Sequence, residues 1–280
     1  MKRWFLTSMI LSLLALSACM ISFDNPQVVD TISLTVSEPA PGGTPPLQLR
    51  ISMGTGTLNL TGGAELLLEG EIRYNVNELK PEFTRQEGSL QVIQSNKVFN
   101  ILSGNKIVND WTLKLGNTPL NLVLEGGAST ANIDLSGVPL AGFKMTDGAS
   151  TTRLKFTSPN PQRMSLFEYV SGASGIDLIG LGYANFQQLR FAAGAGSYNL
   201  DFSGPLSADA SAMIDSDAAS VTISVPASTR TRITITGELT NVTISGAWNA
   251  QERVYENSGS GPLLDISVDM NVGTLKLINQ

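Results

Sequence analysis

The chain has 280 residues and a formal net charge of −6, from 24 acidic and 18 basic residues, and it contains no histidine. An acidic balance is a poor match for nucleic acid and for direct adsorption to anionic lipid headgroups. The absence of histidine excludes the serine–histidine triad and the usual zinc ligand set, so we expect no catalytic residues, no metal and no cofactor.

The first 18 residues have the parts of a secretory signal peptide. Lys2 and Arg3 supply the charged start, and an apolar stretch runs from Trp4 to about Ala15. This stretch is too short to span a bilayer, which takes roughly 20 apolar residues. Residues 1–18 are therefore interpreted as a signal that is removed from the mature protein.

The single cysteine of the chain, Cys19, directly follows Leu16, Ser17 and Ala18. This run resembles the lipobox of bacterial lipoproteins, which implies that Cys19 becomes the lipidated first residue of the mature protein and is not available for a disulfide. The expected location is the extracytoplasmic face of the cell membrane, with the membrane as a partner through the lipid. An ordinary secretory signal beside an unrelated cysteine is the alternative. The sequence does not distinguish an inner from an outer membrane.

Residues 19–46 follow as a lipidated tether, because prolines and glycines concentrate at its far end, between Pro39 and Pro46. Within it, Thr31–Val36 alternates polar and apolar residues. Two interpretations of this patch stay open: part of the tether, or a strand that docks on the folded domain.

From Leu47 to the end, residues 47–280, the chain repeats a small turn followed by an alternating strand. Sparse charge, frequent glycine and abundant Ser, Thr, Ile, Val and Leu favour an all-β domain. The turn alanines recur at steps of 21, 24, 22 and 23 residues: Ala128, Ala149, Ala173, Ala195 and Ala218. A period of roughly 22 residues with alternating apolar positions predicts a β-solenoid, in which stacked coils bury one continuous apolar column. The alternative, an antiparallel sandwich, has little hairpin chemistry to support it beyond Asp147–Gly148.

The order of several motifs also resembles a known family. Trp111-Thr112-Leu113-Lys114-Leu115, Asp134-Leu135-Ser136-Gly137 and Leu200-Asp201-Phe202-Ser203-Gly204 occur in one order with the corner glycines, over roughly residues 47–245. This pattern is similar to that of the toast-rack family of bacterial envelope proteins, which shares its repeat style with adhesin-like domains and cell-wall-active antibiotic response domains. The resemblance implies a right-handed, parallel β-helix-like solenoid outside the cytoplasm, without enzymatic activity.

Two groups of acids are candidates for chemistry. Glu65, Glu69 and Glu71 lie close in sequence, but on alternating β structure they are interpreted as a solvated edge rather than a catalytic pair. Asp134, Asp177 and Asp201 follow successive corners and could stack into a calcium-binding row. We interpret them instead as solubilising residues that discourage sheet aggregation.

Aromatic residues mark two further places. Trp111 is expected in the core or at a cap. Trp248 lies just before a predicted loop, Gln251–Gly261, and Tyr255 lies within it. Both could face a sugar ring, although packing is the favoured interpretation. Beyond the loop, Leu263–Ile278 resumes the alternation, with Val272–Leu277 as the last strand pair.

The sequence thus predicts a lipid-anchored, extracytoplasmic binding or structural module, adhesin-like, whose ligand residues and oligomeric state are unknown. Its partner would be a wall polymer, a glycan or a membrane protein, and not nucleic acid. An envelope-stress sensor acting through a membrane partner is the alternative. A polysaccharide-acting enzyme is a weaker one, because basic residues form no repeating column.

Overall fold

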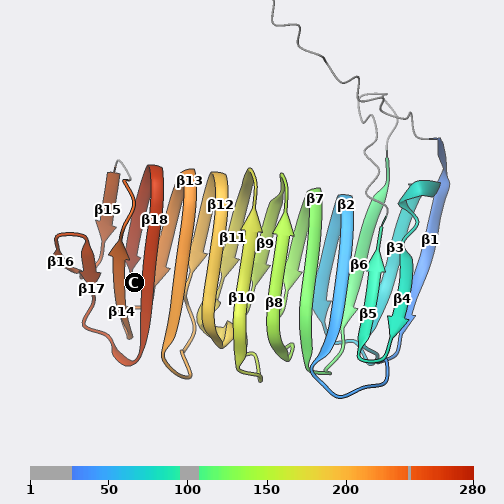
Figure 1. The fold of residues 1–280 in the computed structure, drawn as a ribbon, viewed down its shortest axis with the longest axis horizontal. Coiled ribbons are helices and arrows are strands. Elements are labelled where there is room, and N and C mark those ends of the chain that lie inside the picture. The colour runs from blue at the N-terminus through green and yellow to red at the C-terminus, as the bar shows by residue number, and fades with distance from the viewer. Residues whose placement is uncertain (1–26, 95–106, 239–240) are drawn as a thin grey trace, which may run out of the picture.

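Figure 1 shows the computed structural model, which describes residues 27–94, 107–238 and 241–280. In these ranges the regular structure is β-strand apart from two short 3-10 helices, η1 (Asn77–Leu79) and η3 (Leu181–Ala184), so the all-β prediction is confirmed. No helix within the same ranges combines the length and apolarity that crossing a membrane requires. The strands are β1 (Val28–Glu38), β2 (Leu47–Gly62), β3 (Leu68–Val76), β4 (Glu82–Gln86), β5 (Ser89–Ile93), β6 (Asn109–Leu115), β7 (Leu120–Asp134), β8 (Leu140–Asp147), β9 (Thr151–Lys155), β10 (Met164–Ser171), β11 (Ser174–Ile179), β12 (Phe186–Asp201), β13 (Ala210–Val225), β14 (Thr229–Ile235), β15 (Asn241–Ser245), β16 (Asn249–Gln251), β17 (Val254–Glu256) and β18 (Ser260–Asn279).

The long strands fold back on themselves at a corner, which produces two layers. The rings of Phe186, the first residue of β12, and Phe202, the residue directly after its end, lie 6.4 Å apart between centroids. Closer to the corner, Phe191 and Tyr198 are 5.2 Å apart. The first layer is the row β4, β5, residues 47–53, residues 120–126, β8, β10, residues 186–193, residues 210–216, residues 264–270, β14, β17 and β16. The second layer is the row β1, β3, β6, residues 57–62, residues 130–134, β9, β11, residues 195–201, residues 218–225, residues 272–279 and β15.

Successive coils stack in parallel along the middle of the molecule (Figure 1). In the second layer Ile133 pairs with Leu154, which pairs with Leu178, then Leu200, then Ile223. These partners are 21, 24, 22 and 23 residues apart in the chain. Parallel pairing over this distance identifies a solenoid, and the antiparallel sandwich considered from the sequence is wrong.

The corner needs residues with little or no side chain, because adjacent coils approach closely there. Gly273 has φ = +138°, and a Cβ on it would lie 1.9 Å from the backbone oxygen of Ala219 in the neighbouring coil. No L-residue with a side chain fits this conformation and this contact together.

The core is the apolar column between the two layers, and Trp111 is part of it, as expected from the sequence, with no exposed surface. Its indole nitrogen donates to Asn109 Oδ1 at 2.9 Å. Asn109 in turn bonds to Gln94, whose Nε2 donates to the carbonyl of Leu79 at 2.6 Å. Buried polar groups are stabilising only when paired, and this amide network pairs them where β5, β6 and η1 meet.

At the N-terminal end of the stack, the spatial order differs from the chain order. β2 lies inside the stack and pairs with β7. β3 to β6 come later in the chain, yet they lie on the outer side of β2. β1 pairs antiparallel with β3, with Leu34 opposite Ile72. Of the two interpretations of residues 31–36, the docked strand is therefore the one that the structure has. The folded body begins at β1, before residue 47, because β1 extends the second layer by pairing with β3.

At the other end, the last strand of the chain is not the last strand of the stack. β18 lies between β13 on one side and β14 with β15 on the other. The segment predicted as the loop Gln251–Gly261 instead contains β17, which forms an antiparallel hairpin with β16 and pairs with β14. That prediction is wrong because the backbone of this segment pairs with β14 and β16, and the half-buried Tyr255 packs against the core.

Candidate functional site

The predicted lipidation residue Cys19 and the lipobox residues Leu16, Ser17 and Ala18 lie outside the described residues. The structure begins its description eight residues later, at Gln27, just before β1. The candidate sites that the structure does describe are the outer faces, one buried carboxylate and three surface hollows.

On the outer face of the second layer, acids alternate with bases along the stack. Asp134 lies beside Lys155, with 3.0 Å between the ammonium nitrogen and Oδ2, and Arg153 lies 3.9 Å from Asp177. Partial burial opposes the ionisation of Asp134, but hydrogen bonds from Ser136 and Lys155 outweigh it and lower the pKa of this carboxyl group. These are exposed pairs, each worth at most about 1 kcal/mol.

The three aspartates considered as a calcium row do not stack in one column. Asp177 is level with Arg153 and Asn199, whereas Asp201 is level with Ser224, two residues further along the strand. Among the described residues there is no group of three or more acidic or cysteine side chains placed to hold a metal ion. The interpretation as solubilising surface residues fits this interleaving of charges.

The three glutamates at the N-terminal end of the stack have different neighbours. Glu69 accepts a hydrogen bond from the backbone nitrogen of Leu66 at 3.2 Å and pairs across strands with Lys114. Glu71 is opposite Thr112, and Glu65 is exposed. This arrangement matches the solvated edge expected from the sequence.

The most buried acid of the described chain is Asp147, at the end of β8 and 5% exposed. Tyr169 donates its hydroxyl to Oδ2 at 2.5 Å, Ser174 donates to Oδ1 at 3.1 Å, and Ser171 donates to the same oxygen. Sequence reasoning noticed Asp147 only as part of a turn. The available signal was the alternation in β8, which places Asp147 on the inward face after Phe143 and Met145.

Two tyrosines lie around this carboxylate. Burial raises the pKa of Tyr169 far above its ordinary value of 10.0, and the charge of Asp147 raises it further. Burial also raises the pKa of Tyr198, with smaller contributions from Asp147 and Asp217. The Tyr198 hydroxyl is buried without a hydrogen-bond partner in the described structure. The cluster favours protonated phenols and has no exposed group to act on a substrate.

We therefore expect the protein to lose stability above about pH 10. A group whose pKa is raised by folding stabilises the native state below its unfolded pKa, and this contribution disappears as the pH rises through the folded pKa. The slope should reach about 1.4 kcal/mol per pH unit for each such tyrosine. Tyrosinate absorbance and the urea midpoint, measured together across this range, check the expectation.

The control for that measurement is Asp147→Asn. Removing the charge lowers the pKa of Tyr169, so the stability of this variant should fall less steeply with pH, even though its starting stability is lower. Complete ionisation of all tyrosines near pH 10 with the fold intact would contradict the assignment.

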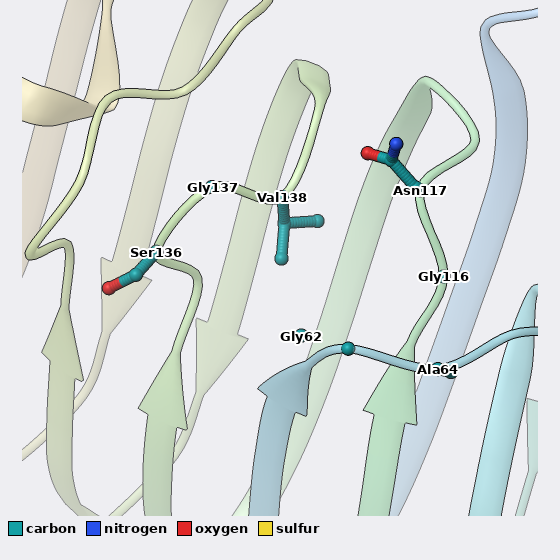
Figure 2. Close-up of a pocket in the computed structure, with 8 residues that line it drawn as sticks. Gly62, Ala64, Gly116, Asn117, Ser136, Gly137 and Val138 are labelled. Carbon is teal, nitrogen blue, oxygen red and sulfur yellow. The ribbon is translucent and has the colours of Figure 1, made fainter.

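A hollow of about 220 Å³ lies where the ends of β2, β6 and β7 meet, and Figure 2 shows residues that line it. Its lining is mostly backbone, from Gly62, Gly116 and Gly137, and the Val138 side chain points into it. Ser136 is directed away and already bonds to Asp134 and Thr157. The hollow lacks converging polar groups that would orient a ligand.

A second, shallower hollow of about 460 Å³ follows the corner across four coils. Its hydroxyl groups largely have hydrogen-bond partners already. The backbone N–H of Ser150 donates to Ser174 Oγ, and the Ser174 hydroxyl donates to Asp147. This surface is a row of small residues above the buried cluster.

The third hollow, about 620 Å³, lies on the outward side of the β14–β17–β16 sheet. We name it the end hollow. Its polar lining includes the ion pair between Arg232 and Glu256, with Nε to Oε1 at 2.7 Å. Trp248 and Tyr255, proposed from the sequence as sugar-facing aromatics, are instead half-buried against the core, as the packing interpretation expected. The residues that line the end hollow are Arg232, Thr234, Asn249, Gln251, Glu252, Val254 and Glu256.

Comparisons with known proteins identify relatives of the chain. Residues 25–167, about half of the chain, match the family model described as the N-terminal domain of toast_rack, DUF2154. A candidate cell adhesion protein from Clostridium sporogenes is 20% identical, with 91% of this chain and 100% of that chain covered and a TM-score of 0.48. A candidate adhesin from Bacteroides fragilis is 10% identical, with 88% and 95% covered and a TM-score of 0.37.

A candidate lipid binding protein from Parabacteroides distasonis is also 10% identical, with 90% of this chain and 96% of that chain covered and a TM-score of 0.25. No curated protein matches the chain.

Proposed function

Because the chain belongs to the toast-rack family, we propose that it is an adhesin-like binding or structural module, held at the extracytoplasmic face of the cell membrane by a lipid on Cys19. The observation that carries the proposal is the solenoid itself, with two long outer faces of polar and paired charged side chains. A stack of this kind is rigid and extended, and repeat folds commonly use such surfaces for binding.

The proposal includes a right-handed solenoid with coils of roughly 22 residues. The pairing distances of 21 to 24 residues between successive coils support the coil length. The handedness rests on the family resemblance and on the strong preference of parallel crossover connections for the right-handed form.

The position of β1 supports display from a membrane. Eight residues separate Cys19 from Val28, and an extended chain reaches at most about 3.3–3.6 Å per residue. A lipid on Cys19 would therefore keep the N-terminal end of the stack within roughly 30 Å of the bilayer surface. The first and second layers would both remain accessible beside it.

The test is capture of the full chain by isolated cell envelope, divided into a wall-polymer fraction and a membrane-protein fraction. Saturable retention by wall polymer is expected for the binding module. Retention of a single membrane protein would instead favour the sensor alternative. The same chain, heat-unfolded on the same matrix, controls for nonspecific retention. Capture by neither fraction would contradict the proposal.

A further inference from the structure

The end hollow lies where the chain departs from its repeat. β16 and β17 form an antiparallel hairpin that continues the first layer beyond β14, at the left end of Figure 1. This hairpin follows the range that matches the family model, which ends at residue 167. Ala250 and Tyr255 pair across it on the inward side. The alternate residues of the same strands face outward and form the hollow.

The outward residues are unusually rich in planar polar groups. Asn249 is opposite Glu256, and Gln251 is opposite Val254 on the neighbouring strand. Arg232 continues the row on β14, opposite Glu256. Amide, guanidinium and carboxylate groups each present at least two polar atoms in a fixed plane. Such groups form paired hydrogen bonds with two hydroxyls on adjacent carbon atoms, and here they supply both donors and acceptors.

The charges of the hollow disfavour an ionic ligand. Glu256 neutralises Arg232, and the hydrogen bond between them raises the pKa of the guanidinium group, with a further contribution from the charge of Asp265. Glu252 adds a negative charge at the hairpin turn. Arg232 is the one cation among the described residues that line the hollow, and it is paired, so a phosphate or uronate would meet these carboxylates without a free cation in the lining. A neutral ligand avoids that repulsion.

The size and floor of the hollow suit more than one sugar ring. Its volume of about 620 Å³ falls in the range of ordinary ligand sites. Val254 contributes an apolar surface among the polar groups, as the carbon face of a pyranose ring requires. The hollow is open, so a chain can enter and leave at its sides.

We propose that the end hollow binds a neutral, polyhydroxylated ligand, a short stretch of a glycan chain, through Arg232, Asn249, Gln251 and Glu256. The inference rests on the proposed function, for which it names the ligand class and the site. Asn249 and Gln251 orient adjacent hydroxyls, and the Arg232–Glu256 pair supplies a donor and an acceptor across the hollow from them.

The experiment is ligand-observed NMR on the full chain, purified in a detergent without a sugar headgroup. The probes are chitotetraose and maltotetraose as neutral glycans and tetragalacturonate as an anionic one. Saturable binding of at least one neutral probe is expected, with tetragalacturonate bound more weakly. The double variant Asn249→Ala, Gln251→Ala should weaken neutral binding by about tenfold or more, because it removes the hydrogen bonds of both amides.

The matched control is Gln48→Ala, Asn121→Ala, which removes two paired outer-face amides at the opposite end of the first layer. It should leave binding unchanged. Equal melting temperatures of both double variants and the unsubstituted chain separate lost binding from lost folding. Undiminished binding by the Asn249→Ala, Gln251→Ala variant would overturn the assignment of the site.

The envelope-capture test separates this inference from the proposed function. If the chain is retained by the envelope but binds neither neutral probe, the end hollow is not a glycan site and the binding module stands. Absence of both binding and capture overturns both.

Discussion

Deleting residues 260–280 should unfold the C-terminal end of the solenoid rather than merely shorten it. In a solenoid stacked in chain order, the last strand is an end cap, and its loss removes one coil. Here β18 is enclosed, with β13 on one side and β14 and β15 on the other. Its removal leaves residues 229–256 without their parallel neighbour and exposes the edge of β13.

The expected effect is large because β18 contributes six core side chains that have no exposed surface. Burying each contributes about 1.5–3 kcal/mol, so the gross loss is on the order of 10 kcal/mol. That is comparable with the whole stability of a typical domain, about 5–15 kcal/mol. The six residues are Leu264, Ile266, Val268, Met270, Leu275 and Leu277.

Limited proteolysis with mass spectrometry, together with sedimentation velocity, measures the outcome. We expect cleavage within residues 229–256 of the truncated chain and self-association through the exposed edge of β13. Ser267→Ala, on the outward side of β18, should change stability by no more than about 0.5 kcal/mol. Protection of residues 229–256 without β18 would mean that β14 and β15 can pair directly with β13, contrary to this expectation.

Cys19→Ser should abolish attachment of lipid to the chain. The thiol is the only one in the sequence, and serine offers no sulfur for the thioether that a lipoprotein carries. Each buried methylene contributes about 0.8 kcal/mol to membrane affinity, and stable anchoring takes more than one acyl chain. The Cys19→Ser chain is therefore expected to lose its membrane anchoring completely rather than in part.

Metabolic labelling with an alkyne fatty acid, followed by mass spectrometry of the N-terminal peptide, checks the prediction. Ser17→Ala is the matched control, because the lipobox pattern accepts either residue at that position, and it should retain the label. A second variant, with residues 1–19 replaced by a cleavable secretory signal, should leave the membrane fraction. Labelling of the Cys19→Ser chain would show that the lipid is attached elsewhere.

The fold class was predictable because the geometry of a solenoid requires local patterns that are visible in the sequence. Alternation of apolar and polar residues identifies the two faces of each strand, as in Ile133 and Asp134. Small corner residues recur because adjacent coils approach to a few ångströms at each turn. The alanine spacing of 21 to 24 residues reappears as the spacing of paired residues between coils.

The candidate sites were less predictable, because they depend on contacts between distant segments. The sequence grouped Asp134, Asp177 and Asp201 by their distance from a corner. In the structure Asp177 pairs at a register position two residues away from that of Asp134. It also did not identify the end hollow, because several of its residues come from the stretch interpreted as a loop and the others from β14 and β16. Asn249 and Gln251 alternate around Ala250, which was the available signal.

What the sequence by itself determined is the local geometry: β-strands, corners, the inward face and the repeat length, each encoded within about one coil. Only the tertiary structure decided which strand pairs with which at the two ends. β2 and β18 each lie inside the stack, and β1 docks on β3. The physical reason is that alternating strands of similar composition present nearly equivalent edges, so their order depends on the burial and hydrogen bonding of the whole assembly rather than on any one segment.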